Sequence, residues 1–368
     1  MNIYNDKRVV LTLDAGGSNF VFSAIQGGVE IVDQVCLPSN AHDLDLCLKT
    51  IFKGFHNIQD QLNGSAVAIS FAFPGPADYP NGIIGDLPNL PAFRGGVALG
   101  PMLKEEFSLP VYINNDGSLF VYGEAIAGLL PELNMLLEKN GSGKRYSNLI
   151  GFTLGTGFGA GIVVSGKLLI GDNSLGGEAW LLRDMADTST NIEESISIRA
   201  LKNAYALKAG ITEGEIPGPK EVEQIAMGDR EGDREAALEV YKDMGRALGE
   251  AMATVSTLVD GLIVLGGGIS AAHHLFLEEA IAQMNGNFSK PEGNLLSRLA
   301  MQIFNLEDQK QLKQFLAGDS RTIEVPGTEK RMIYDQLARS GIGISRLGTS
   351  ESVAIGAYAY ALDRLEKD

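Results

Sequence analysis

Two stretches of the chain share one pattern of apolar runs and glycine-rich turns. In residues 9–25 a β-prone apolar run leads into a glycine-rich turn, and an alternating run follows it. Residues 149–164 repeat the arrangement, and an offset of 139 residues superposes Asp14 on Thr153 together with the strands and glycines. The pattern predicts two β-hairpins with glycine-rich turns. The repeat predicts a chain made of two related halves.

The rest of the first half alternates between predicted strands and a predicted helix. Residues 66–73 and 111–114 are strand-like, and the second run leads into a polar turn at 115–118. The periodicity after that turn predicts a helix over residues 119–129. We therefore expect the first domain to end near Gly128.

The second half is dominated by helical periodicity. After a polar loop at residues 138–147, apolar positions recur at helical spacing over 193–208 and again over 234–258. Residues 261–265 form a buried-type strand that leads into three glycines and another helix. Residues 286–348 are more polar and less regular, and we assign no chemistry to them.

This alternation of strands and helices predicts an α/β fold with mixed sheets. We expect an N-terminal lobe over residues 1–128, completed by a C-terminal helix over residues 352–368. We expect a C-terminal lobe over residues 129–351, which would carry the second and third glycine clusters.

The charge and the cysteine count limit the partners and the compartment. The chain carries 30 Lys and Arg against 46 Asp and Glu, a formal net charge of −16. We expect neither nucleic acid nor an anionic membrane as a partner, because both would be repelled. No apolar run approaches the ~18 residues of a membrane span, and the N-terminus does not read as a signal peptide. Two cysteines, Cys36 and Cys47, fit a reduced cytoplasm and exclude a disulfide framework.

Glycine is in excess, with 45 residues in 368 against a usual share of ~7%. Three clusters each follow a predicted strand, at residues 14–18, 155–161 and 266–268. Backbone N–H groups in such turns can bind phosphate, and glycine lets the phosphate approach. One such turn alone is typical of ordinary loops. Three turns, two of them duplicated, favour phosphate binding.

Two familiar nucleotide motifs are excluded by their context. Residues 155–159 resemble a dinucleotide fingerprint, but that motif must open a helix, and residues 162–164 predict a strand. Residues 141–144 resemble the end of a P-loop. The first glycine of that motif would have to stand where Glu138 stands, and its Ser or Thr where Arg145 stands.

The combination of these motifs resembles the sugar kinase branch of the actin-like ATPases, and specifically the ROK family (repressor, open reading frame, kinase). The Asn-Asp catalytic turn matches Asn115 and Asp116, and Gly123-Glu124 follows at the expected distance. The other matching segments are the first phosphate motif at 13–18, with Ser18 where Thr is usual, the sugar-proximal segment at 74–93, the second phosphate motif at 155–159, the Gly-Glu sugar motif at 177–178, and the adenosine motif at 265–269.

The resemblance implies a two-lobed actin-like ATPase (ribonuclease H-like) fold, with duplicated mixed sheets flanked by helices and an interdomain cleft. It implies an ATP-dependent kinase that uses Mg²⁺ to phosphorylate a hexose or N-acetylhexosamine. It also implies a homodimer, with the dimer surface in the C-terminal lobe. The nucleotide and phosphate contacts would be made by Asp14, Gly16, Gly17, Ser18, Gly155, Thr156, Gly157, Gly266, Gly267 and Gly268.

Two acidic residues carry the predicted chemistry. Phosphoryl transfer needs a base for the acceptor hydroxyl and charge stabilisation around the phosphates. Asp116 is the candidate base, although an Asp in this setting is more often a turn or helix-cap residue. Asp14 would hold Mg²⁺ through water, although by itself it would be read as a turn residue that supports the hairpin.

Planar amides and carboxylates suit the hydroxyls of a sugar. The candidate contacts are Gly75, Asn89, Asn115, Glu178 and Glu193. The neighbouring Glu194 fits the role of Glu193 equally well, and a solvated helix face explains both. Trp180 could stack on a sugar face, but a single Trp is more often a packing residue.

The chain departs from the family at its zinc motif. The zinc-binding histidine would fall at Leu181, and residues 185–194 contain no cysteine. We therefore expect no zinc site and a sugar preference that differs from the zinc-containing glucokinases. No DNA-reading extension precedes Asp14, so we do not expect the repressor function found in part of the family.

Other functions remain open at this point. The main alternative is a sugar-binding regulator of the same family without efficient kinase activity, against which the presence of Asp116 argues. A chaperone or filament ATPase would leave the Asn-Asp turn unused, and a polyphosphate phosphatase would leave Asn89 and Glu178 unused. The sequence does not identify the sugar or the hydroxyl that is phosphorylated.

Overall fold

A computed structural model describes residues 3–87 and 90–367. Asn89, a predicted sugar contact, lies outside the described residues. The chain divides into two compact units. The first unit comprises Met1–Gly128, Gly161–Gly177 and Arg346–Asp368, and the second comprises Leu129–Ala160 and Glu178–Ser345.

The first unit contains the first predicted hairpin, the turn at Asn115 and Asp116, and the last helix. Its elements are the 3-10 helix Ile3–Asn5, β1 (Val10–Ala15), β2 (Asn19–Gln26), β3 (Val29–Glu30), β4 (Val35–Pro38), α1 (Leu44–Gln59), β5 (Ala68–Ala72), β6 (Ala77–Asp78), β7 (Ile83–Ile84), α2 (Leu99–Phe107), β8 (Val111–Asn114), α3 (Asp116–Ile126), β11 (Lys167–Leu168) and α11 (Thr349–Leu365).

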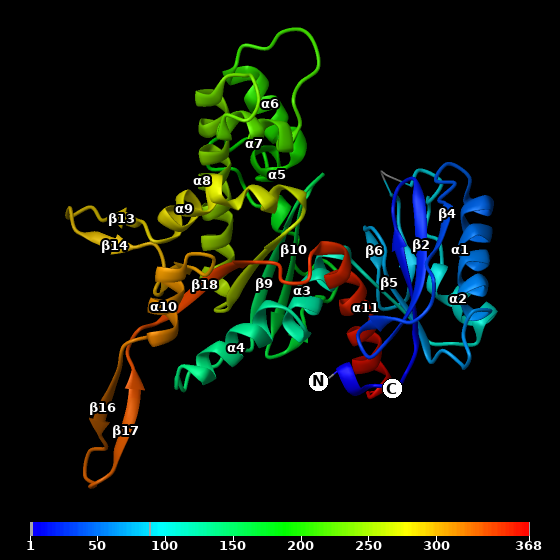
Figure 1. Cartoon of the computed structure of the whole chain (residues 1–368), viewed down its shortest axis with the longest axis horizontal. Coiled ribbons are helices and arrows are strands. Elements are labelled where there is room, and N and C mark those ends of the chain that lie inside the picture. Colours follow the sequence, from blue (N-terminus) through cyan, green and yellow to red (C-terminus); the bar gives the residue numbers. More distant parts are fainter. Residues whose placement is uncertain (1–2, 88–89, 368) are drawn as a thin grey trace. The chain divides into compact units, whose positions relative to one another are not determined.

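Helices cover both faces of the sheet in the first unit. The strand order is β3-β2-β1-β5-β8, with β4 paired to β2. Side chains alternate along β5, so Ile69 and Phe71 join the apolar core under α1 and α2. On the opposite face Ala72 packs with Leu119 and Ala357 of α3 and α11. Figure 1 shows α1 and α2 on one side of this sheet and α11 on the other.

Two glycines let α3 and α11 cross at close range. A Cβ atom on Gly123 would lie 2.0 Å from the backbone oxygen of Ser352, and one on Gly356 would lie 2.0 Å from that of Leu119. No side chain fits at either point, so the backbones themselves are in contact. The crossing fixes the start of α11 beside the helix that begins at Asp116.

The second unit contains the second hairpin and most of the helices. Its elements are α4 (Leu129–Lys139), β9 (Leu149–Leu154), β10 (Phe158–Val164, through which the boundary passes), the 3-10 helix Ala179–Leu181, α5 (Glu193–Ile196), α6 (Ile198–Lys208), α7 (Pro219–Met227), α8 (Arg234–Leu258), β12 (Leu262–Gly266), the 3-10 helix Gly268–Ala272, α9 (His273–Met284), β13 (Asn287–Ser289), β14 (Leu295–Ser297), β15 (Gln302–Asn305), α10 (Gln309–Ala317), β16 (Ser320–Glu324), β17 (Arg331–Asp335) and β18 (Arg339–Ile344).

The second sheet repeats the strand order of the first. Its order is β11-β10-β9-β12-β18-β15, in which β9, β12, β18 and β15 are parallel neighbours. In both sheets a short strand and a hairpin are followed by parallel strands, two in the first sheet (β5 and β8) and three in the second (β12, β18 and β15). The duplication predicted from the glycine pattern is therefore confirmed, and so is the mixed α/β fold.

Several predicted boundaries were wrong. The helix expected over residues 119–129 begins at Asp116 and ends at Ile126, and the one expected over 193–208 is broken at Ser197. Ser197 has an extended backbone, and its side chain accepts a hydrogen bond from Ala200 N, so it caps a new helix. The C-terminal helix spans Thr349–Leu365.

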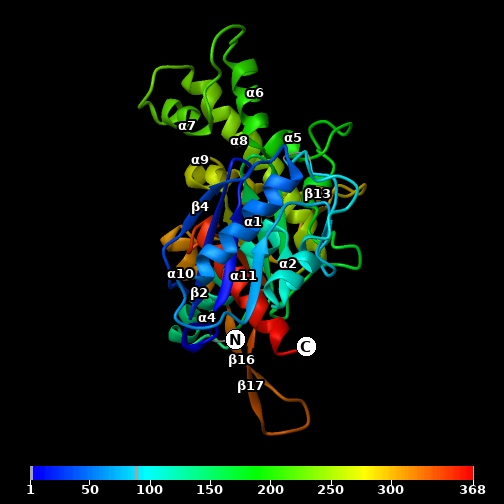
Figure 2. The ribbon, with the colours of Figure 1, turned by 90° about the vertical axis from the view of Figure 1, so that its right-hand side faces the viewer.

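Residues 286–348, expected to be less regular than the rest of the second half, form several strands and a helix. β15 and β18 complete the second sheet, and α10 lies between them in the chain. The remaining residues form two separate hairpins, β13–β14 and β16–β17. Figure 2 shows the β16–β17 hairpin extending away from the other strands of its unit.

The contacts also place residues 161–177 differently from the predicted lobes. The sequence assigned them to the C-terminal lobe, whereas their contacts are with the first unit. A Cβ atom on Gly161 would lie 2.4 Å from the backbone oxygen of Gly117, and Tyr79 N donates to Ser174 Oγ at 3.3 Å. Glycine at 161 permits this close approach to α3.

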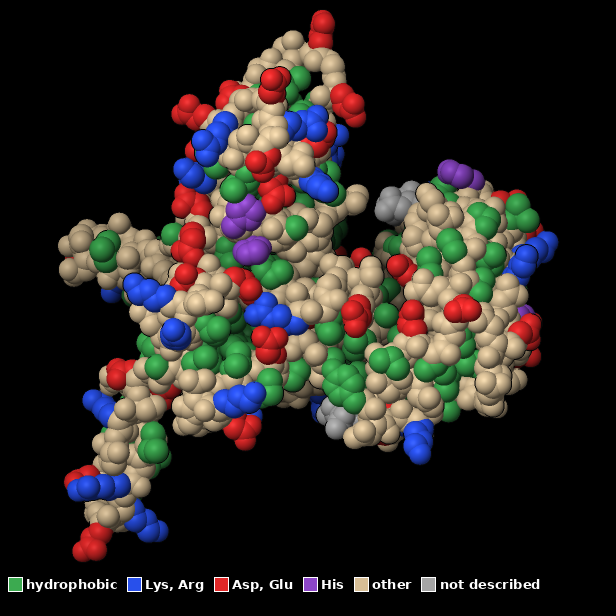
Figure 3. All heavy atoms as spheres, viewed as in Figure 1, with side chains coloured by type: hydrophobic (Ala, Val, Ile, Leu, Met, Phe, Trp, Pro, Cys, Tyr) green, Lys and Arg blue, Asp and Glu red, His purple; other side chains and the backbone are tan. Residues whose placement is uncertain are grey.

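The distribution of surface charge bears on the prediction that the chain binds neither nucleic acid nor an anionic membrane. On the face drawn in Figure 3, Lys and Arg side chains are scattered among acidic ones and form no continuous patch.

Among the described residues one span, Asp116–Lys139, is long and apolar enough to cross a membrane. It comprises two helices, α3 and α4, and 56% of its most apolar window is buried, and core helices pass the same test.

Candidate active site

One edge of the first sheet gathers the predicted catalytic and phosphate residues. Because β1, β5 and β8 are parallel neighbours, their carboxyl ends meet at this edge. Asp14 lies near the end of β1, Gly75 follows β5, and Asn115 and Asp116 follow β8. Open α/β sheets bind ligands at this kind of edge.

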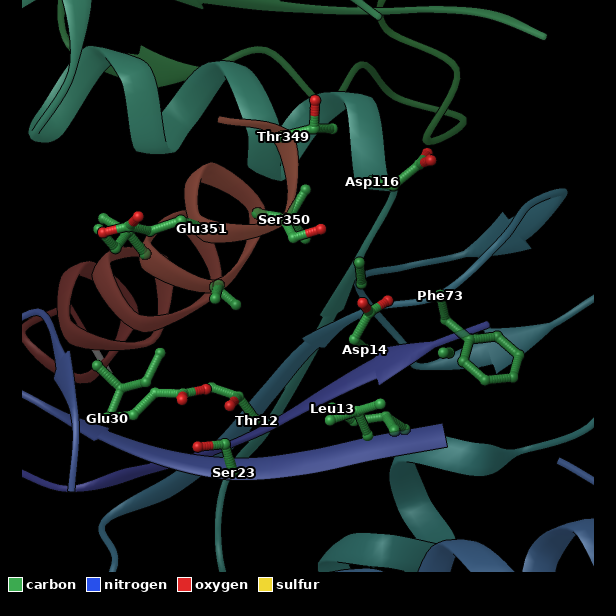
Figure 4. A pocket seen from close by; sticks show the side chains of 18 of the residues that line it. Thr12, Leu13, Asp14, Ser23, Glu30, Phe73, Asp116, Thr349, Ser350 and Glu351 are labelled. Carbon is green, nitrogen blue, oxygen red and sulfur yellow. The ribbon is translucent and has the colours of Figure 1, made fainter. Parts of the chain in front are cut away.

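A cavity of about 970 Å³ opens beside these strand ends. Asp14, Gly75, Asn115 and Asp116 line it, and Figure 4 shows Asp14 and Asp116 together in its wall. Further lining residues, which the sequence reasoning missed, come from the sheet and from the start of α11: Thr12, Ser23, Glu30, Thr349, Ser350 and Glu351. No residue of the described lining is Lys, Arg or His, so the cavity suits a neutral or cationic ligand.

The Asn-Asp turn is also the start of α3. Asn115 is the N-cap residue, and its Oδ1 accepts a hydrogen bond from Gly117 N at 2.9 Å. The same N–H also lies 2.9 Å from Oδ1 of Asp116. The capping role that we weighed against catalysis therefore belongs to Asn115. Asp116 is held at the first turn of the helix and is exposed to the cavity.

The surroundings of Asp14 disfavour the ionised form of its carboxyl group. Partial removal of water from its carboxylate raises the pKa of Asp14, and the negative charge of Asp116 raises it further. Two carboxylates close together repel each other, and a bound cation would relieve this repulsion. The pair therefore suits a divalent cation.

Asp14→Asn should raise the melting temperature at neutral pH. The folded-state pKa of Asp14 is raised, so its ionised form destabilises the fold at pH values above that pKa, and Asn removes the cost. As the pH falls below the ordinary pKa of Asp, the carboxyl is protonated in both states and the gain should vanish. Thermal unfolding of both proteins across the acid range measures this difference. A gain that grew toward low pH would contradict the assigned cause.

The glycine turn at residues 14–18, the first predicted phosphate motif, is stabilised by hydrogen bonds from Ser39, which the sequence did not single out. Ser39 is 2% exposed, its Oγ donates to the backbone oxygen of Gly17 at 2.6 Å, and its N donates to that of Ser18 at 2.9 Å. A Cβ atom on Gly16 would lie 2.8 Å from the oxygen of Asn19, whereas one on Gly17 would meet nothing within 4 Å. Gly16 is therefore needed by the turn itself, and the space beside Gly17 is open to a ligand.

The second unit brings its two glycine motifs to one edge in the same way. β9 and β12 are parallel neighbours with Thr153 paired to Gly266, so residues 155–157 and 266–268 follow adjacent strand ends. Gly267 has a φ of +86°, and a Cβ atom there would lie 2.3 Å from the backbone oxygen of Leu154. Any other residue at 267 would push these turns apart.

Glu193 supports the glycine turn at residues 155–159, the second predicted phosphate motif. Its Oε2 accepts a hydrogen bond from Phe158 N at 2.9 Å, and a Cβ atom on Gly157 would lie 2.7 Å from that same oxygen. Thr156 lies in the same turn, in which Gly155 N donates to Gly157 O at 3.0 Å. Contact with a sugar stays a prediction for Glu193, and Glu194 is instead paired with Arg199 at 2.5 Å.

Glu178 and Trp180 are bonded to each other. The indole N–H of Trp180 donates to Glu178 Oε2, and both side chains are half-buried. This hydrogen bond fixes the orientation of the indole and of one carboxylate oxygen. Sugar contact by Glu178 stays a prediction.

The segment in which the family would carry zinc is held together by Asp184. Asp184 is 3% exposed, and its carboxylate accepts from Ala186 N at 2.8 Å and from Ser195 Oγ at 2.5 Å. Its N donates to the backbone oxygen of Thr190 at 3.1 Å. Leu181 is 58% exposed, and the described residues contain no group of three or more His, Cys, Asp and Glu side chains that could hold a metal ion.

Asp184→Ala should lower the stability by about 2–3 kcal/mol, because buried hydrogen-bond donors to a carboxylate lose their acceptor. Denaturant unfolding measures the loss, and Asp187→Ala, an exposed acid of the same loop, is the matched control. Incubation of the wild type with a chelator should leave its melting temperature unchanged, and metal analysis should find no stoichiometric zinc. A chelator-dependent loss of stability would contradict this account of the loop.

Comparison with known proteins places the chain in a family. The ROK family model matches residues 10–297. This chain belongs to the ROK family. The chain is similar to a glucokinase from Parabacteroides distasonis whose crystal structure is known. The two sequences are 50% identical, the alignment covers 99% of each chain, and the structures superpose with a TM-score of 0.91. The family and the actin-like sugar kinase fold predicted from the sequence are therefore confirmed.

More distant ROK relatives differ in the sugar that they are named for. A glucokinase of Halalkalibacterium halodurans is 26% identical over 72% of this chain and 82% of its own length. An N-acetyl-D-glucosamine kinase of Yersinia enterocolitica is 25% identical over 72% of this chain and 86% of its own.

Proposed function

We propose that this chain transfers the γ-phosphoryl group of ATP to a hydroxyl of a hexose or an N-acetylhexosamine, with Asp116 as the general base. The coarser part of the prediction, an ATP-dependent sugar kinase, is supported by relatives named glucokinase and N-acetyl-D-glucosamine kinase. The observation that carries the finer part is the cavity in which Asp116 and Asp14 stand together at the ends of parallel strands.

Asp116 has the placement that a base needs. It stands at the first turn of α3, is exposed in the cavity, and its Oδ1 is oriented by Gly117 N. A base must lie within hydrogen-bond reach of the hydroxyl that it deprotonates. In the proposal the acceptor hydroxyl binds between Asp116 and Asn115, and its proton moves to the carboxylate as the phosphoryl group arrives.

Asp14 would hold Mg²⁺ through water. Its raised pKa and the proximity of Asp116 make a cation favourable there, and carboxylate oxygens and water are the ligands that Mg²⁺ prefers. Bound Mg²⁺ would neutralise charge on the β- and γ-phosphates. The cavity lining supplies no positive side chain for that purpose among its described residues.

The glycine turns would bind the phosphates and the nucleoside. Positions 17, 155 and 268 have no atom within 4 Å of an added Cβ, so their backbones are open to a ligand. Ser18 and Thr156 would add hydroxyl donors, and Gly266 to Gly268 would take the adenosine. Gly75, Asn89, Asn115, Glu178 and Glu193 remain the proposed sugar contacts.

An ADP-release assay over a panel of sugars tests the proposal. The panel comprises glucose, fructose, mannose, allose, N-acetylglucosamine and N-acetylmannosamine, each with and without Mg²⁺. We expect Mg²⁺-dependent turnover on at least one sugar. Sugar binding without ADP release on any of them would overturn the proposal in favour of a sugar-binding regulator. The proposal also places the enzyme in the cytoplasm as a homodimer.

A further inference from the structure

The β16–β17 hairpin is an exposed arm of the second unit. We define the arm as residues 320–335; its two strands form a separate sheet that pairs with no other described strand. Met332, Ile333 and Tyr334 are 53%, 76% and 45% exposed. A two-stranded hairpin alone is marginally stable in water. Large apolar side chains on such an arm point to a binding partner.

The alternation of hydrogen-bonded and non-bonded residue pairs along the arm determines which backbone groups face its outer edge. At its tip Val325 N donates to Lys330 O, and at its base Gln336 N donates to Asp319 O. Bonded and non-bonded pairs alternate along an antiparallel ladder. Met332 and Tyr334 of β17 are therefore bonded to β16. The backbone N–H and C=O groups of Arg331, Ile333 and Asp335 face the outer edge.

β17 is self-complementary along that edge. Its sequence is Arg331-Met332-Ile333-Tyr334-Asp335, with a positive charge at one end, a negative charge at the other and apolar residues between. If a second β17 pairs antiparallel about a two-fold axis at Ile333, Ile333 lies opposite itself. Arg331 then lies opposite Asp335 of the second copy, and all three outward-facing residues form bonded pairs.

The charges in this pairing have opposite signs. The side chain of Arg331 is 70% exposed and lies 3.4 Å from Glu324 of β16, an exposed ion pair that can rearrange. The side chain of Asp335 is 20% exposed and is paired with Arg339 at 2.5 Å. Burial alone would raise the pKa of Asp335, but the hydrogen bond and charge of Arg339 outweigh it and lower that pKa, so Asp335 stays negative. Opposite charges directly across antiparallel strands are favourable. The arm itself is neutral, with Arg321, Lys330 and Arg331 against Glu324, Glu329 and Asp335, on a chain of net charge −16. Figure 3 shows both signs along it.

Neither the other strand of the arm nor the other hairpin has this property. If two copies of β16 paired antiparallel about a two-fold axis at Thr322, Arg321 would lie opposite Ile323 and Ser320 opposite Glu324. In β14 it would place Leu295 opposite Ser297, with no charge pair at all. Self-complementarity is specific to β17.

We propose that the arm is a self-association surface, in which the outer edge of β17 pairs antiparallel with β17 of a second copy of this chain. The pairing forms a four-stranded sheet from two arms. One face carries the two Ile333 side chains between the Arg331–Asp335 pairs. The other face places Met332 opposite Tyr334.

A charge at the two-fold position should break the association. Ile333→Lys places two positive charges opposite each other and removes apolar contact, so we expect the dissociation constant to rise roughly tenfold or more. Leu295→Lys, at a residue 68% exposed on β14, is the matched control and should change nothing. Sedimentation equilibrium over a wide concentration range measures both. A wild type that stays monomeric, or an Ile333→Lys protein that associates like the wild type, would overturn the proposal.

A disulfide at position 333 tests the register separately. A bonded antiparallel pair has a Cα–Cα distance of ~5.5 Å, which a disulfide spans. In a Cys36→Ser background, which removes the exposed native thiol, Ile333→Cys should give a cross-linked dimer under mild oxidation. Met332→Cys should cross-link only when mixed with Tyr334→Cys. Cross-linking of Leu295→Cys to the same extent, or none at 333, would contradict the register.

Discussion

Asp116→Asn is expected to lower kcat by about 10²–10⁴-fold, the range typical of a general base. Asn keeps the size of the side chain and one acceptor oxygen for Gly117 N, but it cannot take the proton of the sugar hydroxyl. ATP affinity should be nearly unchanged, because the proposed nucleotide contacts are made by the glycine turns. Steady-state kinetics on the preferred sugar and a nucleotide binding titration measure the two effects.

A matched control separates this effect from a general change of charge. Asp45→Asn removes the same charge from an exposed position in the first turn of α1, on the other face of the sheet, and should leave kcat unchanged. Near-normal kcat in the Asp116→Asn protein would remove Asp116 from its proposed role. A loss of both kcat and ATP binding would indicate a binding role instead.

Glu124→Ala is expected to destabilise the fold by about 3–5 kcal/mol, because three donors lose their shared acceptor and each buried donor left unsatisfied costs about 1–3 kcal/mol. Glu124 of α3 is fully buried and accepts hydrogen bonds from Arg346 N at 3.1 Å, Leu347 N at 3.2 Å and Ser352 Oγ at 2.8 Å. Removing the carboxylate leaves these buried donors without that acceptor at the start of α11. Denaturant unfolding measures the loss.

Glu124→Gln provides the internal comparison. It keeps one acceptor oxygen and the volume of the side chain, so it should cost clearly less than Glu124→Ala. Glu105→Ala, an exposed change on α2, should have an effect within about 0.5 kcal/mol. Equal losses for Glu124→Ala and Glu105→Ala would show that the buried carboxylate does not hold the start of α11. The Glu124→Ala protein should also bind sugar more weakly, because the start of α11 lines the cavity.

Much of the candidate site followed from local sequence. Asp14 and Asp116 each lie where an apolar run ends in a polar turn, and parallel strands bring such ends to one edge. The repeat of the hairpin and its glycines predicted two sheets of one topology, which the strand orders confirm. Apolar strand segments and glycine turns depend on residues that are close together in the sequence. They can therefore be predicted without knowledge of distant contacts.

Other parts of the molecule depend on contacts between residues far apart in the chain. Thr349 to Glu351 reach the cavity because Gly123 and Gly356 let α11 cross α3, and Ser39 fixes a turn more than twenty residues before it. Periodicity reports which face of an element is buried, but not which distant residue covers it. For the same reason the sequence alone described residues 286–348 only as more polar and less regular.

The sequence by itself determined the family, the duplicated α/β architecture and the two acidic residues at the strand ends. Only the tertiary structure decided that Asn115 caps α3 while Asp116 faces the cavity, that Glu193 supports a glycine turn, and that β17 presents a free edge. The physical reason is that each of these roles is set by the partner of a hydrogen bond. The fold determines which residues become hydrogen-bond partners. The tendency to form a strand or a turn depends on residues that are neighbours in the sequence.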